Sequence, residues 1–151
     1  MHHFLEWHAS QYMTKNVTAV PSTMSLHDLG ALFDRYDYNS FPVVDDEVCV
    51  GIVTKFDFLK SFVFRTSQLV PHYHDLMGRT VRDVMSKDLV FVEPETPLTR
   101  VLELMISTRA RSFPVLEPGH KLLGMISRTD ISRALYASDE EDKVTRHAIT
   151  V

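Results

Sequence analysis

The amino-acid sequence predicts a mixed α+β fold in which one β-α-β-β-α unit occurs twice. The tetrapeptide Ser-Phe-Pro-Val stands at 40–43 and again at 112–115, each time followed by a turn and a second apolar strand. An offset of 72 residues places Met13 on Met85, and turn and helix-start signals stay in register along the repeat. A copy of roughly 55 residues is too small to bury a good core alone. We therefore expect the two copies to pack sheet to sheet in pseudo-twofold symmetry.

The elements of the first copy follow from apolar spacing and from turn residues. Ser25 and Asp28 have the spacing of a capping box at the start of a helix. Two later runs are too apolar to have one solvated face, as expected of strands covered on both sides. We expect, in order, a lead helix over 4–12, a strand over 16–20, a helix over 26–36, strands over 41–44 and 48–53, and a helix from 57 to 64.

The second copy repeats this order from Thr80. Thr96 and Pro97 supply an N-cap followed by a proline at the first helical position, and Pro118-Gly119 marks a hairpin turn. We expect a lead helix over 81–85, a strand over 89–92, a helix over 98–106, a hairpin from 113 to 127, and a last helix through 136.

These elements divide the chain into four parts. They are the first copy with its lead helix at 1–64, a connector at 65–79, the second copy at 80–137, and a C-terminal tail at 138–151. The tail opens with an acidic run, 138–142, that we expect to fray. Residues 144–151 fit either a continuing tail or a short accessory strand.

Composition and charge exclude several classes of function. The net charge of −4 provides no basic footprint for nucleic acid or for an anionic membrane. No apolar stretch approaches the roughly 20 residues that span a bilayer, and the N-terminus lacks the pattern of a secretory signal. The single cysteine, Cys49, lies in an apolar run and fits a buried side chain in a reducing compartment. We therefore expect a cytoplasmic protein with neither a nucleic-acid nor a membrane partner.

No group of residues argues for catalysis. The sequence has no Walker loop, no G-x-S-x-G and no H-E-x-x-H. His72-Tyr73-His74 has a spacing that two metal ligands can use, but no carboxylate or thiol cluster lies nearby, so a polar connector is favoured. We expect no catalytic residue, no metal and no catalytic cofactor.

The two junctions Thr54-x-x-Asp57 and Ser127-x-x-Asp130 each follow an apolar strand and open a helix. Both fit an N-terminal capping box, which is a purely structural role. Both also fit a ligand site, because a helix N-terminus favours phosphate or ribose oxygens. In that case the acid accepts hydrogen bonds from ribose hydroxyls and the Ser or Thr hydroxyl donates to a phosphate. The residues alone leave both interpretations open.

The ordered set of motifs resembles the tandem CBS (cystathionine β-synthase) domain pair, or Bateman module. The matching residues are Tyr12-Met13-Thr14 and Asp83-Val84-Met85-Ser86, Ser-Phe-Pro-Val in both copies, and Gly-Ile-Val-Thr-x-x-Asp with Gly-Met-Ile-Ser-x-x-Asp. The resemblance covers about residues 11–137. It implies a regulatory pair that binds adenosine-containing ligands such as AMP, ADP, ATP or S-adenosylmethionine and dimerises into a disc of four repeats. We expect no fused effector domain and therefore expect the chain to signal to a separate, unidentified effector protein.

The resemblance also implies two clefts, each joining the acid of one copy to the adenine pocket of the other. The first cleft would contain Met13, Asn16, Val17, Thr18, Tyr38, Asn39, Ser40, Arg111, Ser127, Arg128 and Asp130. The second would contain Thr54, Lys55, Asp57, Met85, Asp88, Leu89, Val90, Ala110 and Ser112.

The two clefts differ in charge. Arg111 stands two residues before the Phe-Pro aromatic of the second copy, where relatives often have a basic residue that reaches phosphates, whereas the first copy has Asn39. Asp88 replaces Asn16 in the second cleft and adds negative charge near the base. We therefore expect the Asp130 cleft to hold phosphorylated nucleotides better. Lys55 and Arg128 are secondary phosphate candidates that fit equally well as solvated charges at helix starts.

The leading hypothesis is a homodimeric sensor of AMP, ADP or ATP that passes ligand occupancy to its effector by a shift between conformational populations. A ligand-independent scaffold, with its clefts closed by Tyr38, Met13 or Arg111, is the alternative from another class. A sensor of S-adenosylmethionine or NAD and, with less support, an enzyme of small nucleotides also fit.

Overall fold

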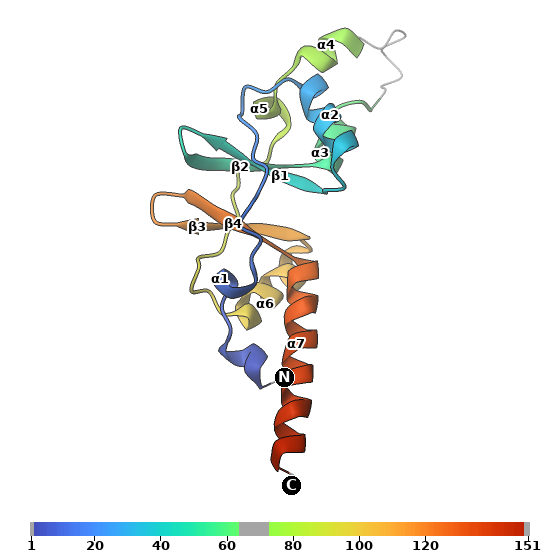
Figure 1. The fold of residues 1–151 in the computed structure, drawn as a ribbon. Coiled ribbons are helices and arrows are strands. Elements are labelled where there is room, and N and C mark those ends of the chain that lie inside the picture. Colours follow the sequence, from blue (N-terminus) through green and yellow to red (C-terminus); the bar gives the residue numbers. More distant parts are fainter. Residues whose placement is uncertain (1, 64–72, 150–151) are drawn as a thin grey trace. The chain divides into compact units, whose positions relative to one another are not determined.

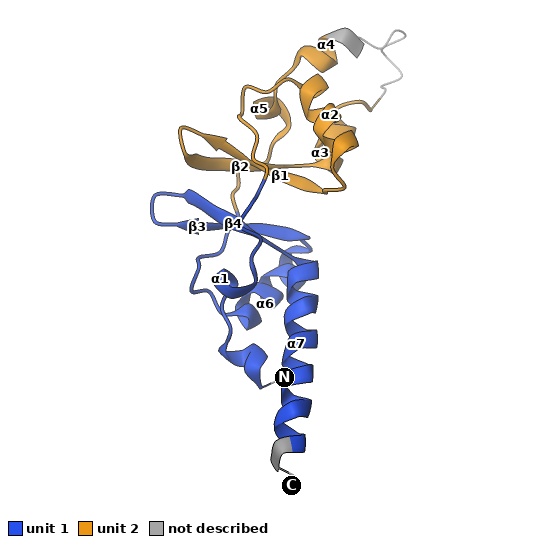
Figure 2. Cartoon of the chain, in the orientation of Figure 1, with its two compact units in different colours: residues 1–17, 90–151 blue, residues 18–89 orange. Residues whose placement is uncertain are grey.

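The computed structural model describes residues 2–63 and 73–149, which form two compact units (Figures 1 and 2). Unit 1 comprises residues 1–17 and 90–151, and unit 2 comprises residues 18–89. The units therefore divide the chain differently from the sequence repeat. Each combines the hairpin and helices of one copy with the short lead helix of the other copy.

The described residues of unit 2 form the hairpin of the first copy and four helices. Its elements are α2 (Leu26–Arg35), β1 (Ser40–Asp45), β2 (Val48–Thr54), α3 (Lys55–Lys60), α4 (Tyr73–Gly78) and α5 (Val81–Val84). Helix α2 begins where the sequence predicts, because the Ser25 hydroxyl accepts a 3.1 Å hydrogen bond from the backbone N–H of Asp28. Residues 65–72 of the expected connector lie outside the described residues, and α4 occupies most of its remainder.

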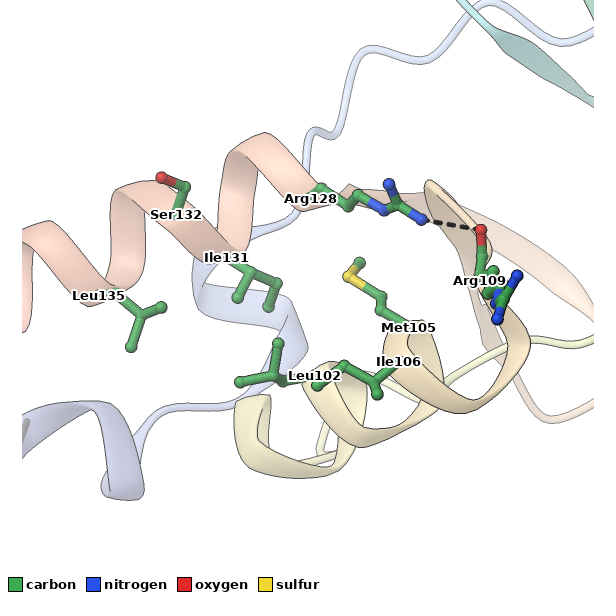
Figure 3. A pocket seen from close by; sticks show the side chains of 8 residues that line it. All are labelled: Leu102, Met105, Ile106, Arg109, Arg128, Ile131, Ser132 and Leu135. Atoms are coloured by element: carbon green, nitrogen blue, oxygen red, sulfur yellow. Dashed lines mark hydrogen bonds between the residues drawn. The ribbon is translucent and has the colours of Figure 1, made fainter.

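Unit 1 contains the hairpin of the second copy. Its elements are the 3₁₀ turn η1 (His3–Glu6), α1 (Ala9–Tyr12), α6 (Leu98–Thr108), β3 (Ser112–Glu117), β4 (Lys121–Ser127) and α7 (Arg128–Ile149). Helices α6 and α7 face each other across a groove (Figure 3). The lead helix expected over 4–12 is instead divided into two short helices, η1 and α1, which are separated by the extended residues Trp7 and His8.

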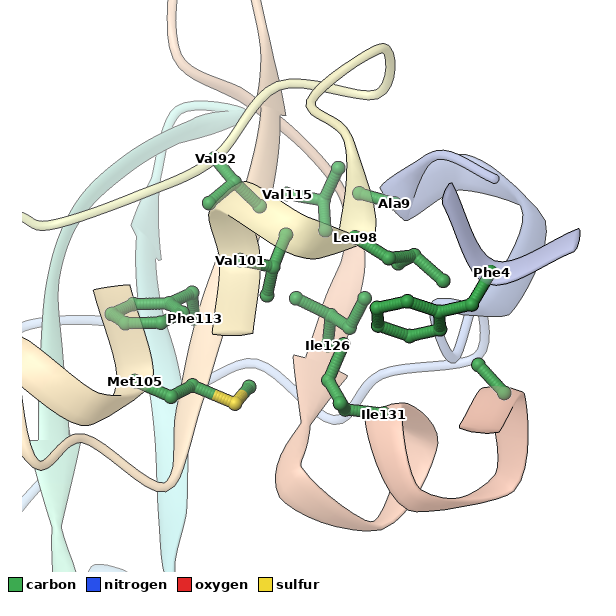
Figure 4. Close-up of a cluster of buried hydrophobic side chains, with 11 residues drawn as sticks. Phe4, Ala9, Val92, Leu98, Val101, Met105, Phe113, Val115, Ile126 and Ile131 are labelled. Atoms are coloured by element: carbon green, nitrogen blue, oxygen red, sulfur yellow. The ribbon is translucent and has the colours of Figure 1, made fainter. Parts of the chain in front are cut away.

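Each unit has its own hydrophobic core. In unit 1 the apolar faces of α6 and α7 pack on the β3–β4 hairpin, and η1 covers one end with Phe4 (Figure 4). The buried side chains are Phe4, Ala9, Val92, Leu98, Val101, Met105, Phe113, Val115, Ile126, Ile131 and Ala134. The core of unit 2 is built equivalently from Val20, Leu26, Leu29, Phe33, Phe41, Val43, Val53 and Val81.

Both hairpins are antiparallel and turn through left-handed backbone. Asp46 and Glu47 have φ values of 48° and 67° between β1 and β2, which matches the twist of two-residue hairpin loops. The longer turn between β3 and β4 uses Gly119 at φ 88° and His120 at φ 62°. The predicted hairpin positions are confirmed in both copies.

After each lead helix, one residue pairs through its backbone with a hairpin strand of the other copy. Thr14 exchanges hydrogen bonds of 2.8 and 3.0 Å with Met125, and Ser86 exchanges bonds of 2.9 and 3.2 Å with Ile52. This pairing attaches residues of the first copy to the hairpin of the second, and the reverse. It is the physical reason why the compact units mix the two copies.

The structure also corrects the sequence predictions of two strands, one helix cap and one pair of helix bounds. The predicted strands over 16–20 and 89–92 are reduced to isolated bridges, Val20 with Val43 and Val92 with Val115. Thr96 does not cap α6, because its hydroxyl accepts from the backbone N–H of Glu93 in the preceding turn, and Pro97 is the N-cap instead. Helix α3 also begins at Lys55 and ends at Lys60 rather than spanning 57–64.

The C-terminal segment is helical as far as Ile149 rather than frayed from Ser138. Ser138 is buried, and its hydroxyl accepts a 3.0 Å hydrogen bond from the backbone N–H of Phe4. Lys143 pairs with Asp139 and Glu140 at 3.1 and 3.2 Å, which balances the acidic run along the helix surface. These contacts explain why an acidic segment continues the helix.

Candidate functional site

The acid of the second copy is Asp130, a buried carboxylate in the first turn of α7. Its Oδ2 accepts hydrogen bonds from the backbone N–H of Ser127 at 2.8 Å and from the Ser127 hydroxyl at 3.0 Å. The Asp130 backbone N–H donates back to that hydroxyl at 3.3 Å. The capping interpretation of this pair is therefore realised in the structure, and the ligand contact stays a prediction.

The second carboxylate oxygen of Asp130 is held by a residue that sequence reasoning missed. Arg133 donates from Nη2 to Oδ1 at 2.6 Å, one turn further along α7. Such charge-assisted bonds are short and strong. The signal that could have found Arg133 is the i, i+3 spacing of acid and base on one helix face.

Asp57 is the equivalent acid of the first copy, at the start of α3. Its Oδ2 accepts from the backbone N–H of Thr54 at 3.0 Å, and the Thr54 hydroxyl accepts from the Asp57 backbone N–H at 3.0 Å. Lys60 takes the place of Arg133, with its Nζ 3.5 Å from Oδ1. The side chain of Asp57 is 16% exposed, against 6% for Asp130, so the first copy has the more open acid.

The two basic residues predicted for the Asp130 cleft have different surroundings. The guanidinium of Arg128 closes the C-terminal end of α6, donating from Nη2 to the Arg109 carbonyl at 2.8 Å and from Nε to the Ala110 carbonyl at 3.2 Å (Figure 3). A cation at this end of a helix is electrostatically favourable. Arg111 is exposed, and its backbone carbonyl accepts from the backbone N–H of Arg128 at 3.0 Å. Arg111 therefore remains the better phosphate candidate of the two.

The matching positions of the first copy lie in unit 2. The backbone N–H of Lys55 donates to the Asn39 carbonyl at 2.8 Å, as Arg128 does to Arg111. The ammonium of Lys55 lies 5.9 Å from the centroid of the Phe33 ring. Tyr38 is 45% exposed, and its ring stacks on Tyr36 with the ring centroids 5.3 Å apart.

The two predicted methionines lie over the glycines of the hairpins. A Cβ at Gly124 would lie 3.1 Å from the Met13 sulfur, and a Cβ at Gly51 would lie 3.2 Å from the Met85 sulfur. The glycines thus permit the close approach of the lead segments. Asn16 and Asp88, three residues after each methionine, are exposed, and their contact with a base stays a prediction.

The residues of each predicted cleft are divided between the units. In the first cleft, unit 1 supplies Met13, Asn16, Val17, Arg111, Ser127, Arg128 and Asp130, and unit 2 supplies Thr18, Tyr38, Asn39 and Ser40. In the second cleft, unit 2 supplies Thr54, Lys55, Asp57, Met85, Asp88 and Leu89, and unit 1 supplies Val90, Ala110 and Ser112. Within the units, the structure pairs Ser127 with Asp130 and Thr54 with Asp57. The assembly of the other predicted residues into two clefts stays a prediction.

A groove on unit 1 runs between α6 and α7 and has a volume of about 410 Å³ (Figure 3). It is lined by Leu102, Met105, Ile106, Arg109, Arg128, Ile131, Ser132 and Leu135. Most of the lining is apolar, and Ile106 is 71% exposed. The acid and hydroxyl of the predicted nucleotide site do not line it.

Three further expectations concern metals, the cysteine and membranes. Among residues 2–63 and 73–149 no group of three metal-ligating side chains forms, and His72 lies outside that range. Cys49 is buried, which raises the pKa of its thiol and fits the predicted core role. None of the helices in the described part of the chain is both long enough and apolar enough to cross a membrane.

Comparison with known proteins places this architecture in a family. The family model of the CBS domain matches residues 9–63 and 81–137. The structure of CBSX2, a CBS-pair protein of Arabidopsis thaliana, in complex with AMP has a TM-score of 0.77 and 26% sequence identity, covering 88% of this chain and 98% of CBSX2. The CBS domain pair of protein MJ0100, in complex with 5′-methylthioadenosine and S-adenosyl-L-methionine, has a TM-score of 0.72 at 19% identity, covering 87% of this chain and 98% of that pair.

Several curated relatives are considerably longer than this chain. The A-adding tRNA nucleotidyltransferase of Geobacter sulfurreducens is 25% identical over 134 residues, covering 89% of this chain but 14% of the enzyme. The chain therefore matches one segment of that much longer enzyme. Because the family model covers both sequence copies, the chain belongs to the CBS domain family and carries two CBS domains in tandem.

Proposed function

We propose that this chain is a regulatory sensor that binds an adenosine nucleotide, with the Asp130 cleft as the better site for AMP or ATP. The observation that carries the proposal is the Asp130 carboxylate, buried at the start of α7 beside the Ser127 hydroxyl. Arg111, whose backbone carbonyl accepts from the Arg128 N–H, is exposed. Carboxylate, hydroxyl and guanidinium are the groups that suit ribose hydroxyls and a phosphate. The AMP complex of CBSX2, similar over most of both chains, supports the same ligand class.

The proposed mechanism is regulatory rather than catalytic. A ligand held by groups from both CBS domains would favour the arrangement of the domains that completes its site, and this difference in affinity would shift the population of conformations. A separate effector protein would read that shift. The buried, unpaired thiol of Cys49 suits a protein that works in a reducing compartment.

The proposed sensor is a homodimer that associates through its helical faces. Ile106 of α6 and the groove beside it are apolar and exposed, and unit 2 exposes Phe56 and Leu59 on α3. Exposed apolar surface larger than scattered single side chains marks interaction sites on soluble proteins. The repeat places such helices on both units of one chain, so a second copy offers matching surfaces.

A thermal-shift series tests the proposal of a sensor directly. We expect millimolar AMP or ATP to raise the unfolding midpoint, because a ligand that binds only the folded state stabilises it. Adenosine, NAD and S-adenosylmethionine measured in parallel rank the ligand class. GMP serves as the control for base recognition. A series in which no ligand raises the midpoint would favour a ligand-independent scaffold.

A further inference from the structure

The Asp130 carboxylate has few hydrogen-bond positions left for a ligand. An ionised carboxylate offers about four acceptor positions on its two oxygens. Ser127 fills two of them on Oδ2, through its backbone N–H and its hydroxyl, and Arg133 fills one on Oδ1 at 2.6 Å. About one position therefore remains. A ribose presents two neighbouring hydroxyl donors, so it needs one position more than the unliganded site provides.

The Ser127 hydroxyl is the contact on Asp130 that a ligand can draw away most easily. The backbone N–H of Ser127 is fixed in the cap of α7, whereas the Ser127 hydroxyl can rotate to suit its partners. A ligand phosphate near Ser127 would accept from that hydroxyl and free a second position on Oδ2. Arg133 instead holds Oδ1 with a charge-assisted bond that a neutral ribose hydroxyl does not displace readily.

The Asp57 site differs at both contacts. On Asp57, Oδ2 accepts from the Thr54 backbone N–H, and the Thr54 hydroxyl accepts from the Asp57 backbone N–H, as the Ser127 hydroxyl does from Asp130. Unlike the Ser127 hydroxyl, the Thr54 hydroxyl does not donate to the carboxylate in the described part of the chain. Lys60 stands 3.5 Å from Oδ1, well beyond the 2.6 Å of the arginine pair. Asp57 therefore has room for both ribose hydroxyls without losing any contact.

We propose that Arg133 is a specificity-determining residue of the Asp130 site, because its hold on Oδ1 makes full ribose binding depend on a ligand phosphate that draws the Ser127 hydroxyl away. Lys60 imposes no such dependence on Asp57. The inference rests on the proposed nucleotide function and deepens it. The Arg133 contact thus makes the Asp130 site select phosphorylated nucleotides, whereas the Asp57 site also admits unphosphorylated nucleosides.

Arg133 is suited to mutational testing because its own side chain is 61% exposed, so its replacement creates no cavity in the core. Its charge acts on one further neighbour, the Tyr12 hydroxyl. Burial and then Glu141 raise the pKa of Tyr12, and Arg133 opposes that rise. The unfolding midpoint of each variant therefore has to be measured beside its binding.

A reciprocal exchange of the two bases tests the inference. Arg133→Lys is made in an Asp57→Ala background, so that binding reports on the Asp130 cleft, and Lys60→Arg is made in an Asp130→Ala background. Calorimetric affinities for adenosine and AMP are measured for each background and each exchange. We expect Arg133→Lys to tighten adenosine binding by roughly 2- to 10-fold with AMP little changed, since one freed position allows one further neutral hydrogen bond. Lys60→Arg should weaken adenosine binding by a similar factor.

The possible results separate this inference from the proposed function. Unchanged adenosine affinity in both exchanges would overturn the role of Arg133 while leaving nucleotide binding intact. A loss of AMP affinity alone on Arg133→Lys would also overturn it, because it would make Arg133 a direct phosphate contact. If the unsubstituted protein bound neither adenosine nor AMP, the proposed function itself would fail and the inference with it.

Discussion

The carbonyl oxygen of Thr14 occupies the space where a side chain at Gly124 would begin, since a Cβ there would lie 2.5 Å from that oxygen. The two segments are fixed at this spacing by the hydrogen bonds between Thr14 and Met125. Gly51 and the Ser86 carbonyl repeat the arrangement, at 2.6 Å, in the other unit. The two glycines are therefore where each lead segment meets the hairpin of the other CBS domain.

Replacing Gly124 by alanine is expected to destabilise the protein by about 1–3 kcal/mol, because a backbone carbonyl has to move to admit the methyl group. Gly51→Ala should cost a similar amount. Gly78→Ala is the matched control, since a Cβ there meets nothing within 4 Å. Urea denaturation monitored by circular dichroism measures all three. Equal stability of Gly124→Ala and Gly78→Ala would refute the close-approach account.

A buried hydroxyl beside β1 predicts how stability depends on pH. The Ser22 hydroxyl and then the Ser22 backbone N–H donate to Asp45 at 2.5 and 2.9 Å, and these bonds hold the pKa of the Asp45 carboxyl below its usual value. The folded state thus binds this proton less readily than the unfolded chain. The stabilisation is complete above about pH 4, where the unfolded carboxyl is ionised, and is lost as the pH falls further toward the folded pKa.

Asp45→Asn should therefore lower stability by about 1 kcal/mol at pH 7 and by less at pH 3, where the wild-type interaction is already weakened. Asp46→Asn, one residue along in the exposed hairpin turn, removes the same charge without the Ser22 contacts and is the control. Denaturation midpoints at the two pH values supply the measurement. A loss for Asp45→Asn that is equal at both pH values would contradict the assignment.

Arg111 is expected to contribute phosphate binding and little else. Arg111→Ala should weaken AMP and ATP by roughly tenfold, the size of one charge-assisted hydrogen bond, while adenosine binding changes little. Arg100→Ala is the control, because Arg100 is an exposed arginine of α6 that pairs with Glu103. Binding is measured by calorimetry in the Asp57→Ala background, so that the affinities report on the Asp130 cleft. Equal losses for AMP, ATP and adenosine would rule out the phosphate role.

Self-association through the α6–α7 face predicts that Ile106→Glu shifts the protein from dimer toward monomer. The change places a charge on an exposed apolar side chain beside the groove and leaves the buried face of α6 intact. Val144→Glu, on an equally exposed residue of α7 outside the groove, is the control. Sedimentation equilibrium reads the result. A dimer that survives Ile106→Glu unchanged would place the interface elsewhere.

Local signals were sufficient to predict much of the fold. The two hairpins and the start of α2 follow from apolar strands, turn residues and the Ser25 cap, all of which act over a few residues. Local signals could not predict that the lead helix of each copy joins the compact unit of the other copy. That arrangement depends on pairings between distant parts of the chain, such as Thr14 with Met125. The same holds for α7, whose extension is supported by η1 at Ser138.

Sequence reasoning found the acids and hydroxyls of the candidate site but missed what holds them. Asp57 and Asp130 were identified by their place after a strand, and the caps expected there are present. Arg128 donates to the carbonyl of Arg109, whose backbone is left-handed at the end of α6. Arg133 donates to the carboxylate of Asp130. Both hydrogen bonds depend on the side-chain conformation of the arginine. Those features are set by packing rather than by local spacing.

The central claim is that Asp130 binds the ribose of an adenosine nucleotide, and calorimetric titration of AMP into the unsubstituted protein and Asp130→Ala tests it most directly. Asp130→Asn, which keeps an acceptor for the α7 cap, controls for the loss of the cap, and the unfolding midpoint of each variant is recorded. The account predicts AMP binding to the unsubstituted protein, with the tighter binding lost in Asp130→Ala and weakened in Asp130→Asn. Full-strength AMP binding by folded Asp130→Ala, or none by the unsubstituted protein at millimolar AMP, would contradict it.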